Sequence, residues 1–235
     1  TKWKQYDTER NLLLEPSDLR LSVEASLDRL KTDCIDLLQF HGVLPEHYTH
    51  VVERLYPTME DLKVQGKIRF IGFTEVLFED PKHEVVRMAL SSDPGLWDTV
   101  MLKYGILNQW ASKEILPLAE KHEIGVLNMA PVRLTLTRPE KLRTFFEEWT
   151  TRPSNDGLDL SRDNPLEWLV HGEVDSLTTA GYRFSAAHQA ISTVISGSSN
   201  IEHLLQNAKA LETPELATND RDRLIEIFGE SASRD

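Results

Sequence analysis

The sequence predicts an α/β fold built around a parallel β-sheet. Apolar segments of strand length alternate with segments whose apolar residues recur every three or four positions, and five such strand–helix repeats follow one another. The strand segments read as nearly continuous apolar runs, which is typical of strands buried on both faces of a parallel sheet. A doubly wound sheet and a closed eight-stranded barrel both satisfy this pattern, and periodicity does not distinguish them.

The first part of the chain predicts two helices and two strands. Leucines and a valine recur at helical spacing after Ser17, the expected N-cap, and Gly66 is expected to close the second helix in a left-handed conformation. The strand "CIDLLQF" ends at His41 and Gly42. The expected elements are a helix within 15–33, a strand at 34–40, a helix at about 46–65 and a strand at 67–73.

The alternation continues to the end of the repeats. After Val132 the pattern loosens, and "TTRPSNDGLDLSRDNP" is rich in turn formers, so residues 132–164 are expected to form a long surface loop within a single domain that spans residues 1–235. The expected elements are helices near 80–92 and 112–123, strands at 97–105 and 124–131, a helix around 177–187, a strand near 190–195 and a helix around 201–211.

Composition and charge exclude several classes of partner. The 235 residues are 40% hydrophobic and 27% charged with a formal net charge of −12, so we expect no binding to nucleic acid or to an anionic membrane surface. No stretch reaches the ~20 apolar residues of a membrane span, and the single cysteine, Cys34, excludes an internal disulfide. His47 and His50 lack further ligands, so no metal site is expected. A cytoplasmic protein that acts on a small molecule fits these features best.

In both architectures, ligands bind at the carboxyl ends of the strands. His41 and Thr74 occupy two such ends, and "ISGSSN" leads from the last strand into a helix that begins near Asn200. Backbone N–H groups at that turn could bind an anion, although the spacing matches neither a P-loop nor a G-x-G-x-x-G motif. An ordinary capped helix is the alternative interpretation.

Four segments together resemble the aldo-keto reductase superfamily. In chain order they are "SVEASLDRLKTDCIDLLQFHG", "GKIRFIGFTE", "LNQWASKEILPLAEKHEIGVLNMAPV" and "VISGSSNIEHLLQNAKAL". Within the superfamily, the chain is most similar to the branch that contains L-galactose dehydrogenase and D-threo-aldose dehydrogenase. The resemblance implies a (β/α)8 barrel that binds NAD(P)(H) and interconverts carbonyls and alcohols by hydride transfer.

The superfamily uses an Asp, Tyr, Lys and His tetrad, and two of its members match positions in this chain. The resemblance assigns the lysine to Lys2 and the histidine to His41, whereas the tyrosine and the aspartate are expected upstream of Thr1. In such a site the tyrosine is the general acid, the lysine lowers its pKa, and the histidine orients the carbonyl. Because the visible repeats match strands four to eight and the end of strand three, we expect about 50–80 further N-terminal residues, or two to three strand–helix units.

The resemblance also implies a set of cofactor contacts. Thr74 keeps the hydroxyl of the Ser-Asn pair that holds the nicotinamide carboxamide, and Glu75 lacks the amide. Met101 and Met129 stand where many members have a glutamine and an aromatic residue. The remaining expected contacts are Ser196, Gly197, Ser198 and Ser199 for phosphate, Gln206 and Asn207 near adenine, and His203 where NADP-preferring members often carry arginine.

These matches lead to one preferred function and two alternatives. No Lys or Arg lies between Ile191 and Asn207, so a 2′-phosphate would lack a charge partner and NAD(H) is favoured over NADP(H). The preferred function is an NAD(P)-dependent oxidoreductase that acts on aldoses or small aldehydes. The alternatives are a non-catalytic nucleotide-binding or regulatory subunit of the same fold and an unrelated barrel enzyme such as a sugar isomerase.

Overall fold

The structure, a computed structural model, describes residues 2–4, 6–7, 12–76, 78–150 and 164–232, with the backbone alone for Lys2, Trp3 and Thr150. The chain forms two compact units: residues 1–102 with 117–126, and residues 103–116 with 127–235. Each unit has its own buried apolar residues.

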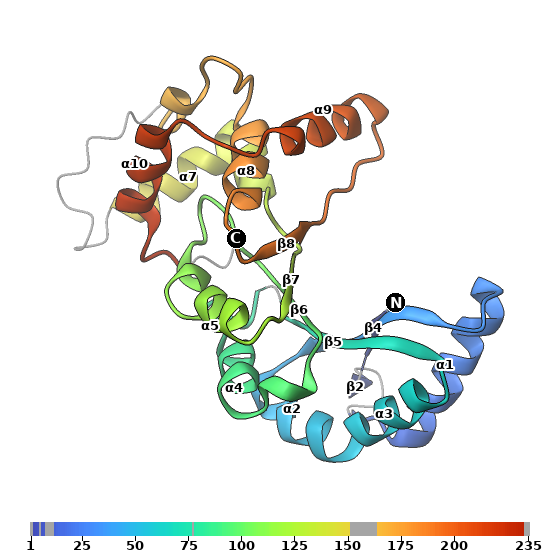
Figure 1. Ribbon diagram of the computed structural model, residues 1–235. Coiled ribbons are helices and arrows are strands. Elements are labelled where there is room, and N and C mark those ends of the chain that lie inside the picture. The colour runs from blue at the N-terminus through green and yellow to red at the C-terminus, as the bar shows by residue number, and fades with distance from the viewer. Residues whose placement is uncertain (1, 5, 8–11, 77, 151–163, 233–235) are drawn as a thin grey trace. The chain divides into compact units, whose positions relative to one another are not determined.

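The first unit is built on parallel strands (Figure 1). The strands β1 (Lys2–Trp3), β4 (Ile35–Val43), β5 (Ile68–Glu75) and β6 (Thr99–Leu102) lie in this order, each paired in parallel with the next. Phe40 lies opposite Phe73, and Thr74 lies opposite Met101. The strand β7 (Gly125–Asn128) follows β6 in the order and ends in the second unit, where β8 (Ile191–Val194) is its neighbour.

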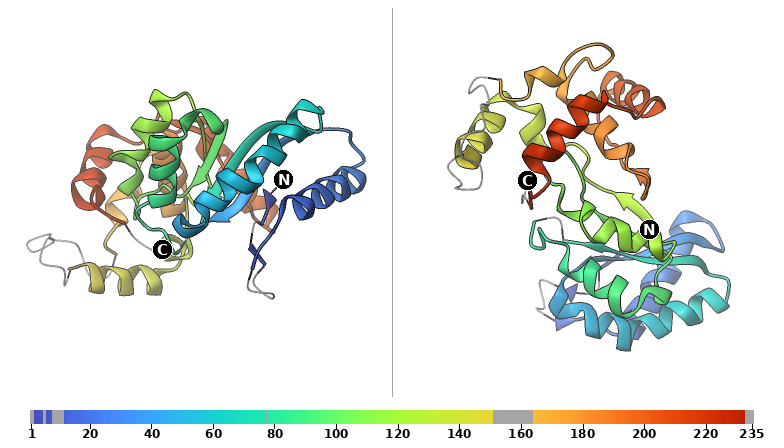
Figure 2. Two further views of the ribbon diagram at one scale, coloured as in Figure 1. Left: turned by 90° about the horizontal axis from the view of Figure 1, so that it is seen from below. Right: turned by 60° about the vertical axis from the view of Figure 1, so that its left-hand side comes forward.

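Helices cover one face of β4 and β5, as Figures 1 and 2 show. Parallel neighbours need crossover connections, and the helices supply them, as the alternation of the sequence predicted. The helical segments between successive parallel strands are α1 (Pro16–Leu30), α2 (Pro45–His50), a π-helical turn at Val51–Leu55, α3 (Tyr56–Val64), α4 (Glu84–Ser92), a 3-10 turn at Pro94–Leu96 and α5 (Ile115–Lys121). A short antiparallel pair, β2 (Tyr6–Asp7) with β3 (Leu12–Leu13), was not predicted.

Aromatic side chains form part of the core of the first unit. The indole of Trp97 is 4% exposed, and its ring lies edge-on to Phe73 with centroids 4.7 Å apart. Its Nε1–H donates to the Tyr48 hydroxyl at 3.2 Å, which in turn donates to Asp93 at 3.1 Å. Burial raises the pKa of Tyr56, which also contacts Trp97, to about 12. Trp97 therefore serves packing in this unit.

The start of α1 corrects the predicted N-cap. The helix begins at Pro16 with Glu15 as its N-cap, and the Glu15 backbone N–H donates to the Asp18 carboxylate at 2.9 Å. Proline is pre-organised for the first helical position and lacks the N–H that would be unsatisfied there, so Ser17 lies inside the first turn. The predicted left-handed Gly66 is confirmed, with φ of 75°.

The second unit combines the end of β7, β8 and several helices. Its elements are a 3-10 turn at Trp110–Ser112, α6 (Leu134–Thr137), α7 (Pro139–Thr150), a 3-10 turn at Glu167–Leu169, α8 (Leu177–Ala186), α9 (Ile201–Glu212) and α10 (Thr218–Phe228). Phe146 of α7 packs edge-on against Phe228 of α10, with centroids 5.8 Å apart.

The prediction of a long loop over residues 132–164 is wrong in part. The helices α6 and α7 occupy much of this segment, and residues 151–163 lie outside the described residues. Pro139 begins α7, in which Leu142, Phe146 and Trp149 recur at helical spacing and are buried. The helix α10 was not predicted at all.

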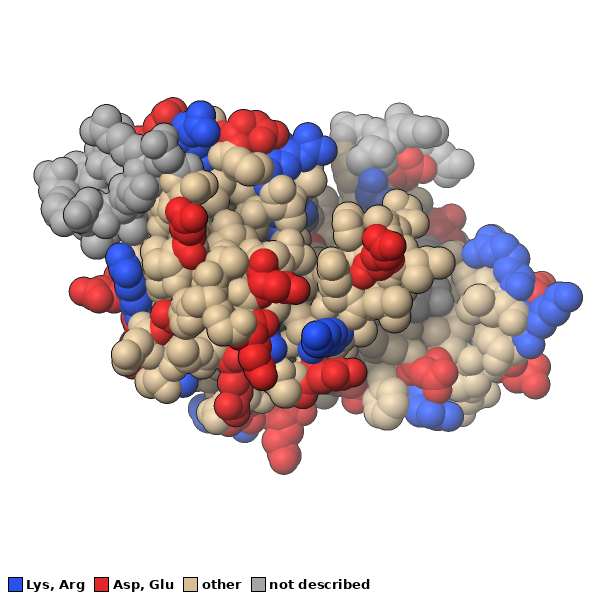
Figure 3. Space-filling view, turned by 90° about the horizontal axis from the view of Figure 1, so that it is seen from above, with Lys and Arg blue, Asp and Glu red and all other residues tan. Residues whose placement is uncertain are grey.

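The surface charge agrees with the acidic composition. Figure 3 shows acidic side chains over the face that it presents, interspersed with separate basic ones. Among the described residues, none of the helices is both long and apolar enough to cross a bilayer.

Candidate active site

His41 lies in an irregularity of β4 at its carboxyl end. The pairing of β4 with β5 is regular up to Phe40, and it resumes three residues later at Val43, whereas the partner strand advances by two. This extra residue is a β-bulge, and such bulges are often found beside active sites. Gly42 adopts φ of 68° within it, a left-handed conformation that favours glycine. The imidazole of His41 is exposed there.

The bulge directs two nitrogen atoms at one hydroxyl. Thr74, the penultimate residue of β5, is 0% exposed, and its Oγ1 accepts from the Gly42 backbone N–H at 2.8 Å. The Nδ1 of His41 lies 3.1 Å from the same oxygen. The Thr74 hydroxyl therefore contacts His41, and its predicted contact with a nicotinamide carboxamide stays a prediction.

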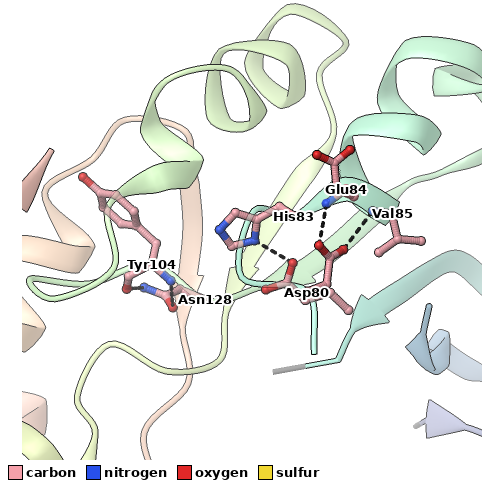
Figure 4. A network of polar contacts seen from close by, with 7 residues as sticks. Asp80, His83, Glu84, Val85, Tyr104 and Asn128 are labelled. Atoms are coloured by element: carbon pink, nitrogen blue, oxygen red, sulfur yellow. Dashed lines mark hydrogen bonds and ion pairs between the residues drawn. The ribbon is translucent and has the colours of Figure 1, made fainter. Parts of the chain in front are cut away.

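A buried acid–imidazole pair follows β5 directly. Glu75 and His83 are both fully buried, and His83 Nδ1 lies 2.6 Å from the Glu75 carboxylate. Figure 4 shows how His83 and Asp80 lie at the start of α4, where the Asp80 carboxylate accepts from the N–H groups of Glu84 and Val85 at 2.8 and 2.9 Å. The pair and the cap hold the segment that follows β5.

The other predicted residues of the first unit lie on strands. The backbone of Lys2 pairs with Gln39 of β4, and the Lys2 side chain lies outside the described residues. Met101 is 3% exposed in β6. Their predicted roles therefore remain predictions.

In the second unit, Asn128 at the end of β7 binds the backbone of Tyr104 at both of its polar atoms (Figure 4). Its Oδ1 accepts from the Tyr104 N–H at 3.1 Å, and its Nδ2 donates to the Tyr104 carbonyl at 2.6 Å. Burial raises the pKa of the Tyr104 phenol well above its ordinary value. Met129, the next residue along the chain, is half-buried.

Ser196 and Asn207, two of the predicted cofactor contacts, bind each other and a third residue. The Ser196 hydroxyl accepts from the Tyr182 hydroxyl at 2.9 Å and from Asn207 Nδ2 at 3.0 Å. These bonds join the residues after β8 to α8 and α9, and Asn207 is 7% exposed. Both predicted residues therefore shape the turn through their side chains, and Tyr182 is a member of the cluster that the sequence did not indicate.

The turn before α9 uses some of its own donors. Asn200 Oδ1 accepts from the Glu202 N–H at 2.8 Å, and Ser198 Oγ accepts from the Asn200 N–H at 3.1 Å. The helix is therefore capped in the ordinary way, as the alternative interpretation of this turn expected. The predicted binding of an anion at this turn stays a prediction.

A cavity of about 730 Å³ lies beside this turn, entirely within the second unit. Its wall includes two arginines, Arg133 and Arg138, and no carboxylate among the described lining residues. Five predicted cofactor residues line it, namely Gly197, Ser198, His203, Gln206 and Asn207, whereas Ser196 and Ser199 are not among the lining residues. The other walls come from Val132, Leu134, Thr137, Ser176, Thr178 and Tyr182.

The two arginines lie outside the turn after the last strand, which is the segment on which the sequence prediction of the cofactor site depended. Arg133 and Arg138 follow the carboxyl end of β7, so the rule that ligands meet strand ends would have included them. Two guanidinium groups and an imidazole without a carboxylate suit a negatively charged ligand.

Comparison with known families decides the classification. The model of the aldo/keto reductase family matches residues 1–227. The chain belongs to this family. As an aldo/keto reductase, it has the (β/α)8 barrel fold class that the resemblance implied, to which its parallel strands and crossover helices conform.

Relatives of this member of the aldo/keto reductase family include two curated dehydrogenases and a reductase of solved structure. The chain is 25% identical over 211 residues to L-galactose dehydrogenase of Arabidopsis thaliana, covering 89% of the chain and 62% of that protein. It is 24% identical over 201 residues to D-threo-aldose 1-dehydrogenase of a Pseudomonas species, covering 83% and 58%. The holo form of an aldo-keto reductase from Bacillus halodurans matches 99% of the chain and 72% of its own, with a TM-score of 0.70 and 25% identity.

This aldo/keto reductase chain spans about 60% of the length of those two curated relatives. The predicted similarity to the L-galactose and D-threo-aldose dehydrogenase branch is confirmed by both matches.

Proposed function

We propose that the protein is an oxidoreductase that interconverts carbonyl and alcohol groups of aldoses or small aldehydes with NAD(P)(H). The observation that carries the proposal is the cavity of the second unit. It brings five residues assigned to the cofactor by the family resemblance together with Arg133 and Arg138. Its volume of about 730 Å³ falls within the range of small-molecule and cofactor sites.

The lining residues fit a dinucleotide. Arg133, Arg138 and His203 can bind phosphate oxygens, and Gln206 can bind polar atoms of an adenosine moiety. The cofactor, when bound, supplies or accepts the hydride. The protein holds the phosphates of the cofactor in a place where none of the described lining residues is a carboxylate that would repel them.

The preference for NAD(H) stays a prediction. It depended on the absence of Lys and Arg between Ile191 and Asn207, and the cavity receives Arg133 and Arg138 from the segment after β7 instead. Either guanidinium group can pair with a 2′-phosphate, so the lack of Lys and Arg after β8 does not by itself exclude NADP(H).

In the proposed reaction His41 orients the substrate. It lies exposed at the carboxyl end of β4, where the substrates of barrel enzymes bind, and its imidazole can donate a hydrogen bond to a carbonyl oxygen. Lys2, on the neighbouring strand β1, supplies the positive charge that lowers the pKa of the tyrosine general acid used in this family.

Turnover by the full-length protein tests the proposal. We expect oxidation or reduction of members of a panel of aldoses and aldehydes with NAD(H) or NADP(H), followed by the cofactor absorbance. Replacement of His41 by alanine should lower kcat/KM by roughly 10²–10⁴-fold while nucleotide affinity changes less than about twofold, because the imidazole acts on the carbonyl.

Nucleotide binding separates this proposal from its alternative. Binding of NAD(P)(H), measured by fluorescence titration, without turnover of any carbonyl or alcohol would favour the non-catalytic nucleotide-binding subunit. Absence of both binding and turnover would contradict the proposed function and that alternative together.

A further inference from the structure

Within the described part of the chain, the hydroxyl of Thr74 has two hydrogen-bonding neighbours. It is fully buried at the end of β5, and the two groups within hydrogen-bonding distance of Oγ1 in the described part of the chain are the Gly42 N–H and His41 Nδ1. A hydroxyl has one hydrogen to donate and two lone pairs that accept. The Gly42 N–H can only donate, so it occupies one lone pair.

The hydrogen of this hydroxyl then needs an acceptor. His41 Nδ1 is the acceptor at hand, and it can accept only when it carries no proton of its own. If Nδ1 were protonated, both neighbours would donate to Oγ1, and the hydroxyl hydrogen would be buried without a partner. Leaving a buried donor unsatisfied is unfavourable, so this arrangement is disfavoured.

We propose that Thr74 is a positioning residue that fixes His41 in the neutral tautomer with its proton on Nε2. The bulge makes this possible, because it aims the Gly42 N–H and the His41 ring at one oxygen atom. A proton held on Nε2 gives the exposed edge of the ring a donor at the carboxyl end of the strand.

The consequence for chemistry rests on the proposed function. A carbonyl oxygen accepts hydrogen bonds and cannot donate them, so a histidine that orients it must present an N–H. Thr74 keeps that N–H on the nitrogen that does not face the hydroxyl. In the other tautomer, His41 would present a lone pair to the carbonyl oxygen, and the two would repel each other.

Nitrogen NMR of the full-length protein reads the tautomer directly. In protein labelled with ¹⁵N-histidine, the His41 signals are assigned by their loss in His41→Gln, and the exposed His203 is the internal reference. We expect Nδ1 of His41 at an unprotonated shift and Nε2 at a protonated one. Thr74→Val, which removes the hydroxyl donor to Nδ1, should raise the fraction of His41 that is protonated on Nδ1, and Thr74→Ser, which keeps the hydroxyl, should retain the wild-type pattern.

Two results would overturn the inference: a wild-type His41 protonated on Nδ1, or a Thr74→Val spectrum with an unchanged tautomer. If the valine variant does not fold, the wild-type tautomer and the serine variant still decide the question. The spectrum is recorded without substrate, so a fixed Nε2–H tautomer in a protein without turnover would contradict the proposed function alone.

Kinetics supply a second readout that a merely structural role would not produce. In an active protein, Thr74→Val should lower kcat by at least about tenfold, since a donor to the carbonyl is lost part of the time. Thr74→Ser should restore most of the activity. Equal activity in the valine and serine variants would contradict the positioning role.

Discussion

At the scale of single residues, Gly42 contributes both to the stability of the fold and to the geometry around His41, and experiments can separate the two contributions. Its left-handed φ of 68° is strained for any other residue, and a Cβ there would meet nothing closer than Val76 Cγ2 at 3.5 Å. Gly42→Ala should therefore lower the free energy of unfolding by about 1–2 kcal/mol through backbone strain alone. It should also lower turnover, because the Gly42 N–H and the His41 ring share one oxygen.

Gly66 provides the matched control for this prediction. It has φ of 75° and open space around its Cβ position, and it follows Gln65, the C-cap residue of α3. Gly66→Ala should lose similar stability in urea unfolding while retaining activity. If both alanine variants lost the same fraction of kcat/KM, the geometry of the bulge would have no special role.

The arginines of the cavity permit a second test at this scale. Arg133→Gln and Arg138→Gln should each weaken nucleotide binding by roughly 10-fold or more, as expected when a charged hydrogen bond worth about 1.5–3 kcal/mol is lost. Fluorescence titration with NADH and NADPH measures the effect. A larger loss for NADPH than for NADH would assign the arginine to the 2′-phosphate, and equal losses would assign it to the diphosphate.

Arg143 is the control for these substitutions, because it is exposed on α7 and is not among the cavity-lining residues. An Arg143→Gln variant that weakened nucleotide binding as much as the other two would indicate a general effect of net charge. Such an effect should become smaller as the salt concentration rises.

At the scale of secondary-structure elements, Asp80 determines where α4 starts. The side chain is 5% exposed, and its two carboxylate oxygens satisfy two N–H groups of the first helical turn. Asp80→Ala should lower the free energy of unfolding by about 1–2 kcal/mol, and urea denaturation measures it. The exposed neighbour Glu79 is the control, and a Glu79→Ala variant with an equal loss would contradict the capping role.

Periodicity predicted the repeating elements well because it reports which faces are buried. The helix within 15–33 and the strand at 34–40 correspond to α1 and β4. It failed where turn formers lie next to a helix. The turn formers of "TTRPSNDGLDLSRDNP" lie at and after the end of α7 and predicted one long loop, although Phe146 and Trp149 recur at helical spacing before them.

At the scale of the whole molecule, charge sets the solution behaviour. Asp and Glu number 38 and Lys and Arg number 26, and the sequence pI is about 5.1. Mutual repulsion keeps such a chain dispersed at neutral pH and disappears near the pI, so solubility should be lowest near pH 5. Light scattering across pH 4–8 measures this, and a minimum above pH 7 would contradict it.

The candidate site was predictable from the sequence only in part, because several of its contacts join residues that are far apart in the chain. His41 could be predicted because a family motif names it. The contact of His41 with Thr74 depends on a register irregularity between two strands, and the approach of Arg133 to the turn after β8 depends on the packing of α6, α8 and α9. Neither contact joins residues that are close together in the sequence, so local sequence patterns do not predict them.

The amide of Asn128 has a consequence for substitution tolerance. Because both of its bonds to position 104 reach main-chain atoms, they do not depend on which side chain stands there. The side chain of Asn128 imitates a peptide group, with one acceptor and one donor in the orientation of a neighbouring strand. Position 104 can therefore change its side chain during evolution without losing this anchor, whereas position 128 cannot.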